Sequence, residues 1–241
     1  LYRRRQRQMC IRDRNKAAIE DHFDHSFELE ATLQAKGKIS ALELVKAMLH
    51  NPGSVQYVRQ QQPAGLGHAV WCARHLVGDE PVAILLADDL ILGTSCVAEM
   101  VEAYQGGNMV AVMNVPADQT GAYGIVTPGE DDGRVVDIKG LVEKPDPAQA
   151  PSNIGVVGRY IITPDVFQTL NAQERGAGGE IQLTDALAKQ IGKASFTGLR
   201  FSGERFDCGS KLGFLQANVA FGLTSPEMAG DLRDWMAGRL A

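Results

Sequence analysis

The sequence predicts an α/β fold: a Rossmann-like, mixed but mainly parallel sheet flanked by helices. Between residues 55 and 115, short apolar runs that suit buried strands alternate with helical segments. Farther along, shorter strands are separated only by polar turns, which indicates an antiparallel or mixed insertion beside the main sheet. The chain has 241 residues, 44% of them hydrophobic, and this is enough for one sizeable core.

The first half supplies the alternating elements. Ser40 is a candidate N-cap with Glu43 completing a capping box, and Asn51-Pro52-Gly53 ends that helix. Six consecutive apolar residues, 82–87, suit a strand buried on both faces. The expected helices are 16–36, 40–49, 66–76 and 95–104, and the expected strands are 55–59, 82–87 and 109–115.

The second half contains the predicted insertion and the closing helices. Thr163-Pro164 marks a helix start, because proline is favoured in a first helical turn. The expected strands are 123–127, 134–138, 141–144, 154–162 and 195–201. One helix is expected to begin at about residue 165, and three more are expected at 181–191, 211–223 and 226–240.

The first fourteen residues differ from the rest in charge. They hold six arginines and one aspartate, and without them 18 basic and 28 acidic side chains remain, a net charge of −10. An acidic body of this kind is a poor nonspecific ligand for nucleic acid. The basic segment could be a nucleic-acid arm, but its apolar residues have no period. We interpret residues 1–14 as a non-native tail and residues 15–241 as the folded domain.

Cysteine usage and hydropathy indicate the compartment. Cys10, Cys72, Cys96 and Cys208 show no C-x-x-C spacing, which predicts free thiols in a reducing cytoplasm. No apolar run is long enough to span a bilayer, and the basic N-terminus lacks the apolar segment of a secretory signal.

Acidic residues follow two of the predicted strands. Asp88 and Asp89 come directly after the apolar run, and ligands of open α/β sheets bind at the carboxyl ends of strands. Asp207 lies at a second strand-to-helix junction. If Asp88 faces Asp207, the pair could hold one Mg²⁺ together with phosphate oxygens. The alternative is a solvated acidic turn, and the spacing alone does not decide between them.

Three further segments combine polar or flexible residues. Gln60 precedes a turn at Gly65-Leu66-Gly67 whose glycines permit close approach of a ligand, although an ordinary tight turn explains them too. Glu143 and Lys144 place a carboxylate and an ammonium at a strand end, where a charged exposed end is the plainer explanation. Glu180 lies at the start of the helix expected at 181–191, where an acidic residue is explained by capping of the helix N-terminus.

Taken in order, these segments resemble the bacterial UTP–glucose-1-phosphate uridylyltransferases from about residue 15 onward. The matching motifs are Val58-Arg59-Gln60, Gly65-Leu66-Gly67-His68-Ala69, Leu86-Ala87-Asp88-Asp89, Ala122-Tyr123-Gly124, Val142-Glu143-Lys144-Pro145, Val157-Gly158-Arg159-Tyr160, Glu180-Ile181-Gln182-Leu183-Thr184-Asp185 and Phe206-Asp207-Cys208-Gly209.

The resemblance implies the fold of nucleotide-diphospho-sugar transferases and a residue for each part of the reaction. Glucose 1-phosphate would attack the α-phosphorus of UTP, with Lys144 and Asp88 as catalytic residues. Asp88 and Asp207 would hold Mg²⁺, with Asp89 supporting them. Gln60 and Gly65 would face uracil, Gly124 and Glu143 would contact glucose, Lys144 would bind its phosphate, and Glu180 would lie near the sugar.

The sequence departs from the family pattern at its start. The family begins with a strand and a Gly-x-Gly-Thr-Arg loop that wraps the triphosphate, and residues 1–14 stand in their place. We therefore expect a fold that lacks its first βα unit, and a 241-residue chain that does not turn over UTP by itself.

Three alternatives remain open at this point. One is a thymidylyltransferase acting on the same sugar phosphate, another is a noncatalytic regulatory paralogue, and the third is a nucleic-acid binder that relies on the basic arm. The resemblance also implies a homo-oligomer, a dimer or tetramer, in which the helices at 211–240 could form contacts.

Overall fold

The computed structural model describes residues 8–12 and 17–240, and it divides into two compact units. The first unit contains the chain up to Gly78 together with Gln173–Leu183. The second contains Asp79–Ala172 and the chain from Thr184 onward. Within the described residues, no helix combines the length and the apolar character that crossing a membrane requires.

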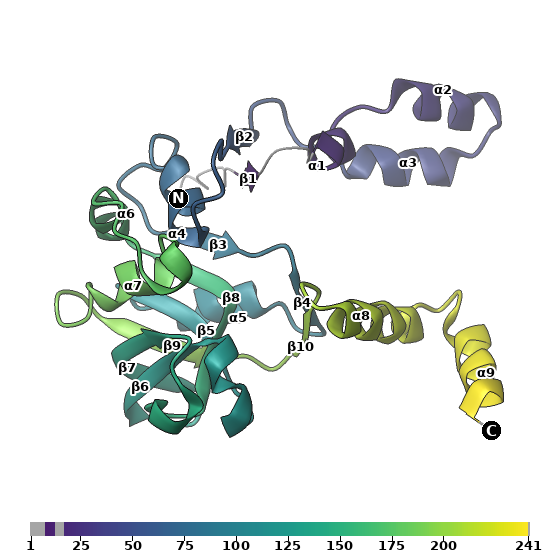
Figure 1. The fold of residues 1–241 in the computed structure, drawn as a ribbon. Coiled ribbons are helices and arrows are strands. Elements are labelled where there is room, and N and C mark those ends of the chain that lie inside the picture. Colours follow the sequence, from purple (N-terminus) through teal and green to yellow (C-terminus); the bar gives the residue numbers. More distant parts are fainter. Residues whose placement is uncertain (1–7, 13–16, 241) are drawn as a thin grey trace. The chain divides into compact units, whose positions relative to one another are not determined.

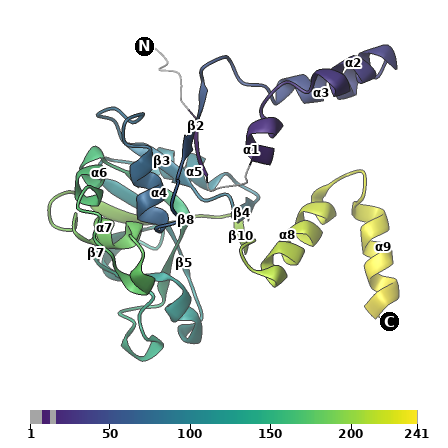
Figure 2. The same ribbon diagram turned by 45° about the horizontal axis from the view of Figure 1, so that its top comes forward.

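The first unit contains a short parallel ladder and several helices. Strands β1 (Gln8–Arg12) and β2 (Val55–Arg59) pair in register from Gln8–Val55 to Arg12–Arg59, and β2 confirms the predicted strand at 55–59. Figure 2 shows α2 and α3 side by side. The helices of this unit are α1 (Ala17–His22), α2 (Phe27–Ala35), α3 (Ile39–Ala47), α4 (Leu66–Cys72) and the 3-10 turn η3 (Ala177–Gly179).

Strand β1 lies within the segment that we set apart from the fold. Residues 1–7 and 13–14 are outside the described residues, but Gln8–Arg12 forms five backbone pairs with β2. The exclusion of the whole segment from the fold is therefore wrong for these five residues. The missing apolar period was a poor guide, because a short parallel strand does not need alternation.

Two helix predictions in this unit also need correction. The single helix expected at 16–36 is broken, since residues 23–26 separate α1 from α2, and residue 16 is outside the described part. Ser40 is not a cap, because α3 already begins at Ile39 and Lys38 occupies the cap position.

The second unit is built on a six-stranded sheet in the order β3-β8-β5-β9-β7-β6 (Figure 1). Its strands are β3 (Val82–Leu85), β5 (Asn108–Asn114), β6 (Gly124–Asp131), β7 (Val135–Glu143), β8 (Ile154–Ile162) and β9 (Phe196–Arg200). The helices are α5 (Cys96–Ala103), α6 (Pro164–Leu170), α7 (Leu183–Ala188), α8 (Lys211–Thr224) and α9 (Ala229–Leu240), with 3-10 turns η1 (Ala117–Ala122) and η2 (Pro147–Gln149).

The mixed α/β class is confirmed, but the expected mainly parallel pairing is wrong for this sheet. Strands β3, β5 and β9 run in one direction, yet β8 lies between β3 and β5 and runs against both. Strand β7 likewise pairs antiparallel with β9 and β6. Strand β8 is buried along nearly its whole length, as is typical of a strand in the middle of a sheet.

The apolar run at 82–87 is not a strand buried on both faces. Strand β3 is an edge of the six-stranded sheet, and Leu85 is 54% exposed. The chain turns after Leu85 and enters an unpredicted strand, β4 (Asp89–Leu92), which pairs antiparallel with β10 (Glu204–Asp207). This small ladder receives both acidic strand ends that the sequence singled out.

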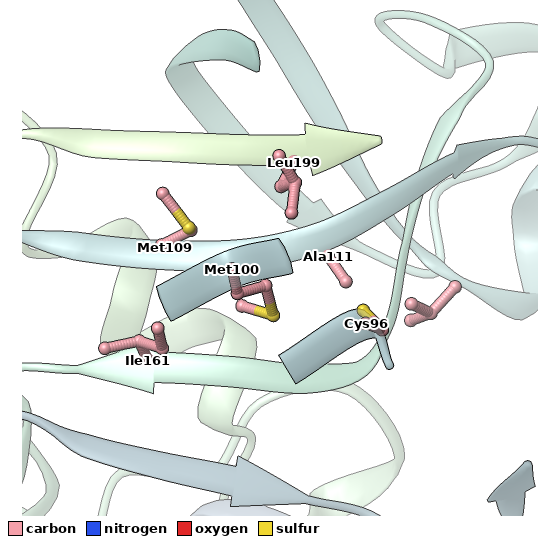
Figure 3. Packing of buried hydrophobic residues seen from close by; sticks show 7 residues of the cluster. Cys96, Met100, Met109, Ala111, Ile161 and Leu199 are labelled. Atoms are coloured by element: carbon pink, nitrogen blue, oxygen red, sulfur yellow. The ribbon is translucent and has the colours of Figure 1, made fainter. Parts of the chain in front are cut away.

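A cluster of buried side chains fastens α5 to the sheet (Figure 3). Met100 of α5 is 1% exposed and packs with Met109 and Ala111 of β5, Ile161 of β8 and Leu199 of β9. Cys96 joins the cluster, and Ser95 caps the helix by accepting a 3.3 Å hydrogen bond from the Ala98 amide. The cluster holds the three central strands on which the site of this unit depends.

We predict that Met100→Ala lowers the free energy of unfolding by about 2–5 kcal/mol, because it leaves a cavity against three strands. Val101 is the matched control, since it lies in the same helix and is 61% exposed. Val101→Ala should change the free energy by no more than about 0.5 kcal/mol. Urea denaturation measures both variants. Equal destabilisation would contradict the assignment of this core.

Candidate active site

The ladder between β4 and β10 brings Asp88 and Asp207 together, as the sequence suggested. Asp207 stands opposite Asp89 in the register, and the Cys208 amide donates a 2.7 Å hydrogen bond to the Asp88 carbonyl. A Cβ atom on Gly209 would lie 3.0 Å from Asp207 Oδ1 and 3.5 Å from Asp88 Oδ2. Oxygens of both carboxylates therefore lie near one point that a glycine leaves open, and Asp207 Oδ1 is held there by a 3.0 Å hydrogen bond from the Gly209 amide.

This pair fits a magnesium ion that also binds a phosphorylated substrate. Mg²⁺ usually takes one or two carboxylates and completes its octahedron with phosphate oxygens and water. Among the described residues there is no cluster of three or more His, Cys, Asp or Glu side chains that could form a closed protein site. Asp88 and Asp207 would hold the ion from one side and leave the other side to a ligand.

Asp89 differs from its neighbour Asp88 in environment and in partners. Asp88 is exposed, whereas Asp89 is 5% exposed and forms a buried ion pair with Arg205. The Arg205 Nε donates to Asp89 Oδ1 at 2.5 Å, and the Gly158 amide donates to Oδ2 at 2.6 Å. Both carboxylate oxygens of Asp89 are thus occupied by protein donors.

Arg159 fastens the same turn to the central strand β8. Its Nη1 donates to the Leu86 carbonyl at 2.9 Å, and its Nη2 donates to the Asp89 carbonyl at 2.5 Å. Sequence reasoning missed Arg159 and Arg205 as site residues. The available signal was an arginine inside the apolar run 154–162, because a buried arginine is rare unless it is paired.

Gly124, Glu143 and Lys144 form a second group in the same unit. Gly124 pairs with Glu143 across β6 and β7, and a Cβ atom on Gly124 would lie 3.2 Å from Glu143 Oε2. Side-chain exposure is 12% for Glu143 and 52% for Lys144. The glycine thus lies directly beside a sheltered carboxylate, with the Thr184 side chain on the same side.

Lys144 has an uncommon backbone conformation for its residue type. It follows the last residue of β7 with φ +45°, and its amide donates a 2.9 Å hydrogen bond to the Tyr123 carbonyl. A non-glycine residue in this region costs free energy and is often found at functional sites. Because Lys144 leaves the strand geometry, its Nζ lies 3.8 Å from Glu143 Oε1, where alternation would have placed the two on opposite faces.

Tyr160 lies in the electric field of both groups. Burial raises the pKa of this phenol far above its usual value, and the negative charges of Glu143, Asp89 and Asp88 raise it further. The hydroxyl therefore stays protonated across the physiological range and remains a hydrogen-bond donor. Tyr160 is 7% exposed, and sequence reasoning did not assign it a role.

In the first unit, Gln60 and Gly65 lie together in the loop that joins β2 to α4. Gln60 is 7% exposed, and its Nε2 donates to the Gly65 carbonyl at 3.2 Å and contacts His68 Nδ1 at 2.9 Å. The amide nitrogen is held inside the protein, so the side chain has one orientation. His68 supports Gln60 rather than a metal ion.

The glycines of this loop permit close contact with the segment around Glu180. The Ile181 amide donates to the Ala64 carbonyl and the Gly67 amide donates to the Ile181 carbonyl, both at 2.8 Å. Gly65 has φ +106°, and a Cβ atom there would lie 2.7 Å from the Ile181 carbonyl oxygen. A side chain is therefore excluded at Gly65 by the fold itself. The Glu180 carboxylate accepts a 3.3 Å hydrogen bond from Gln182 and is exposed.

The sequence matches the nucleotidyl transferase family model over residues 10–221. A UTP–glucose-1-phosphate uridylyltransferase from Komagataeibacter xylinus is 51% identical over 84% of this chain and 72% of that protein. One from Bacillus subtilis is 43% identical over 96% of this chain and 80% of that protein. This chain belongs to the UTP–glucose-1-phosphate uridylyltransferase family of nucleotidyl transferases.

Solved structures of this uridylyltransferase family share the fold. A UTP-bound enzyme from Acinetobacter baumannii has a TM-score of 0.86 at 36% identity, covering 96% of this chain and 82% of that one. A UDP-glucose pyrophosphorylase in complex with UDP-glucose has a TM-score of 0.79 at 37% identity, covering 88% of this chain and 79% of that one. The chain is thus a member of an enzyme family, as the motifs indicated.

Thiol labelling checks the placement of the uridylyltransferase motif around Asp207. Burial raises the pKa of Cys96 to about 11, and only the thiolate reacts with alkylating reagents. Cys96 is 3% exposed, whereas Cys208, next to Asp207, is half-buried. At pH 8 we expect iodoacetamide to modify Cys96 about tenfold or more slowly than Cys208, as measured by peptide mass mapping.

The pH dependence gives the internal control for this labelling. Because the folded protein keeps the Cys96 proton until the pH approaches about 11, its labelling should stay slow at pH 9 and become fast only on unfolding in urea. Cys96 reacting as fast as Cys208 in the folded protein at pH 8 would contradict the placement.

Proposed function

We propose that the site of this protein serves the transfer of a uridylyl group from UTP to glucose 1-phosphate, the reaction that forms UDP-glucose and pyrophosphate. The observation that carries the proposal is the convergence of Asp88 and Asp207 on one open point beside Gly209. Relatives at 43% and 51% identity bear the name of this activity, which favours it over a thymidylyltransferase or a noncatalytic paralogue.

In this reaction a phosphate oxygen of glucose 1-phosphate attacks the α-phosphorus of UTP. A new P–O bond forms, the bond between the α- and β-phosphates breaks, and the electron pair leaves with pyrophosphate. No covalent intermediate on the protein is required, so positioning and charge neutralisation provide the rate enhancement. A magnesium ion held by Asp88 and Asp207 would supply Lewis-acid neutralisation of phosphate charge.

Lys144 and Glu143 would bind the sugar phosphate. The Lys144 ammonium, presented by its left-handed backbone, suits the phosphate that attacks. Glu143 would accept hydrogen bonds from glucose hydroxyls, and Gly124, which lies beside that carboxylate, would contact the sugar through its backbone. Glu180 is a further candidate for contact with the sugar.

Gln60 and Gly65 would recognise the uracil base. The Gln60 amide nitrogen is held by Gly65 and His68, which leaves Oε1 as an acceptor for the N3–H group of uracil. Gly65 would contribute its backbone to the same recognition, since its carbonyl already fixes the Gln60 amide. A fixed amide selects its partner more sharply than a mobile one.

We also propose Mg²⁺ as cofactor, a cytoplasmic location and assembly into a homo-oligomer, a dimer or tetramer. Neither nucleic acid nor a membrane is proposed as a partner. Residues 211–240, which include α8 and α9, expose Leu212, Leu215 and Trp235 at 66%, 61% and 58%. Exposed apolar side chains of this size are typical of interaction surfaces.

Binding of the product UDP-glucose tests the proposal without requiring turnover of UTP. We expect wild-type protein to bind UDP-glucose more tightly with Mg²⁺ present in isothermal titration calorimetry. Asp88→Asn and Asp207→Asn should each weaken the Mg²⁺-dependent binding about tenfold or more, equivalent to ~1.4 kcal/mol.

The control variant for this titration is Asp231→Asn, which alters an exposed carboxylate on α9. It should bind as the wild type does. The proposal fails if wild-type protein does not bind UDP-glucose, or if Asp88→Asn and Asp207→Asn retain the full effect of Mg²⁺.

A further inference from the structure

Arg205 is a buried side chain that connects the two groups of site residues in the second unit. It is 11% exposed and forms an ion pair with Asp89, whose side chain is 7% exposed. Its Nη1 donates a 3.1 Å hydrogen bond to the Tyr123 hydroxyl, and its guanidinium lies 5.5 Å from the centre of the Tyr123 ring. One planar fork thus binds a carboxylate with one part and a phenol with another.

The carboxylate end of this contact determines where the metal-binding pair lies. Asp89 is adjacent to Asp88 in the chain and opposite Asp207 in the ladder, and Arg205 is two residues before Asp207 on β10. Residues two apart on a strand share a face. Arg205 therefore holds β4 and β10 together on the face of the ladder that carries Asp207.

The phenol end of the contact leads to the group that would bind the sugar phosphate. Tyr123 is adjacent to Gly124, and its carbonyl accepts the hydrogen bond from the Lys144 amide. The Tyr123 hydroxyl is thus the link between a network around the carboxylate pair and the backbone that presents Lys144.

We infer that Arg205 is a positioning residue that sets the geometry of the Asp88–Asp207 pair and couples it to the Gly124–Lys144 group through Tyr123. This inference rests on the proposed function of these groups. A buried ion pair is by itself a weak source of stability. A guanidinium that binds both Asp89 and Tyr123, however, fixes the positions of these two side chains relative to each other. Arg205 need not touch the substrate to act in this way.

Titration of Mn²⁺ alone, followed by electron paramagnetic resonance, tests the inference without a nucleotide. Tyr123→Phe removes the hydroxyl and keeps the ring, and we expect it to weaken Mn²⁺ binding about threefold. Arg205→Lys keeps the charge but cannot serve both partners, and we expect it to weaken Mn²⁺ binding about tenfold. Unchanged Mn²⁺ affinity in both variants would overturn the inference.

Tyr104→Phe is the matched control for Tyr123→Phe. The Tyr104 hydroxyl donates a 2.7 Å hydrogen bond to the Gly107 carbonyl, outside this network. Its loss should leave the Mn²⁺ affinity unchanged. If the control weakens Mn²⁺ binding as much as Tyr123→Phe does, the effect reports general loosening of the fold and the inference is wrong.

Binding of UDP-glucose separates positioning from direct contact. If Arg205 sets the carboxylate pair and is coupled to the Lys144 group, Tyr123→Phe lowers UDP-glucose affinity more strongly with Mg²⁺ present than with EDTA. Combined with Asp88→Asn, it should add less than its own single effect. An equal loss with and without Mg²⁺ would mean that Tyr123 contacts the ligand, which contradicts a positioning role.

The two proposals can fail separately in these experiments. Absence of UDP-glucose binding by the wild type would refute the proposed function, while the Mn²⁺ titrations would still decide the role of Arg205. Normal UDP-glucose binding with unchanged Mn²⁺ affinity in Tyr123→Phe and Arg205→Lys would refute the role of Arg205 alone.

Discussion

The register of the β4–β10 ladder is the constraint on which the candidate active site depends. It places Asp207 opposite Asp89, so that Asp88, one residue earlier, lies within reach of the same point as Asp207. A slip of one residue would turn each side chain to the other face and separate the two carboxylates. The buried pair of Asp89 with Arg205 opposes such a slip, since breaking it would leave an uncompensated charge inside the protein.

Two adjacent aspartates acquire different roles from different surroundings. Asp88 lies in the turn before β4 and is exposed, whereas Asp89 is the first residue of β4 and is buried. The buried Asp89 finds Arg205 and the Gly158 amide, while the exposed Asp88 remains available to a cation. The structure also explains why residue 158 is a glycine, because a Cβ atom there would collide with the Asp89 carboxylate.

The sequence predicted the elements and motifs better than it predicted their pairing. The strands at 55–59 and 154–162 were located correctly, and the acidic strand ends were recognised. The sequence did not predict that β8 lies between β3 and β5. Chain order suggests that consecutive strands are neighbours, and only the burial of both faces of β8 indicates a central position. Strands β4 and β10 are four residues long and too short to show a period. Arg159 and Arg205 were missed because their partners are distant in the chain.

The conformation of Lys144 shows why a site of this kind needs a rigid sheet around it. A left-handed lysine costs of order 1–3 kcal/mol and persists only where the surroundings determine it. Its amide is held by Tyr123, Tyr123 is held by Arg205, and Arg205 is held by the buried Asp89. The Asp89–Arg205 ion pair therefore helps to hold the left-handed backbone conformation of Lys144 through these contacts. The residues that would bind sugar phosphate and metal are linked by the same contacts, so a change at either group should be transmitted to the other.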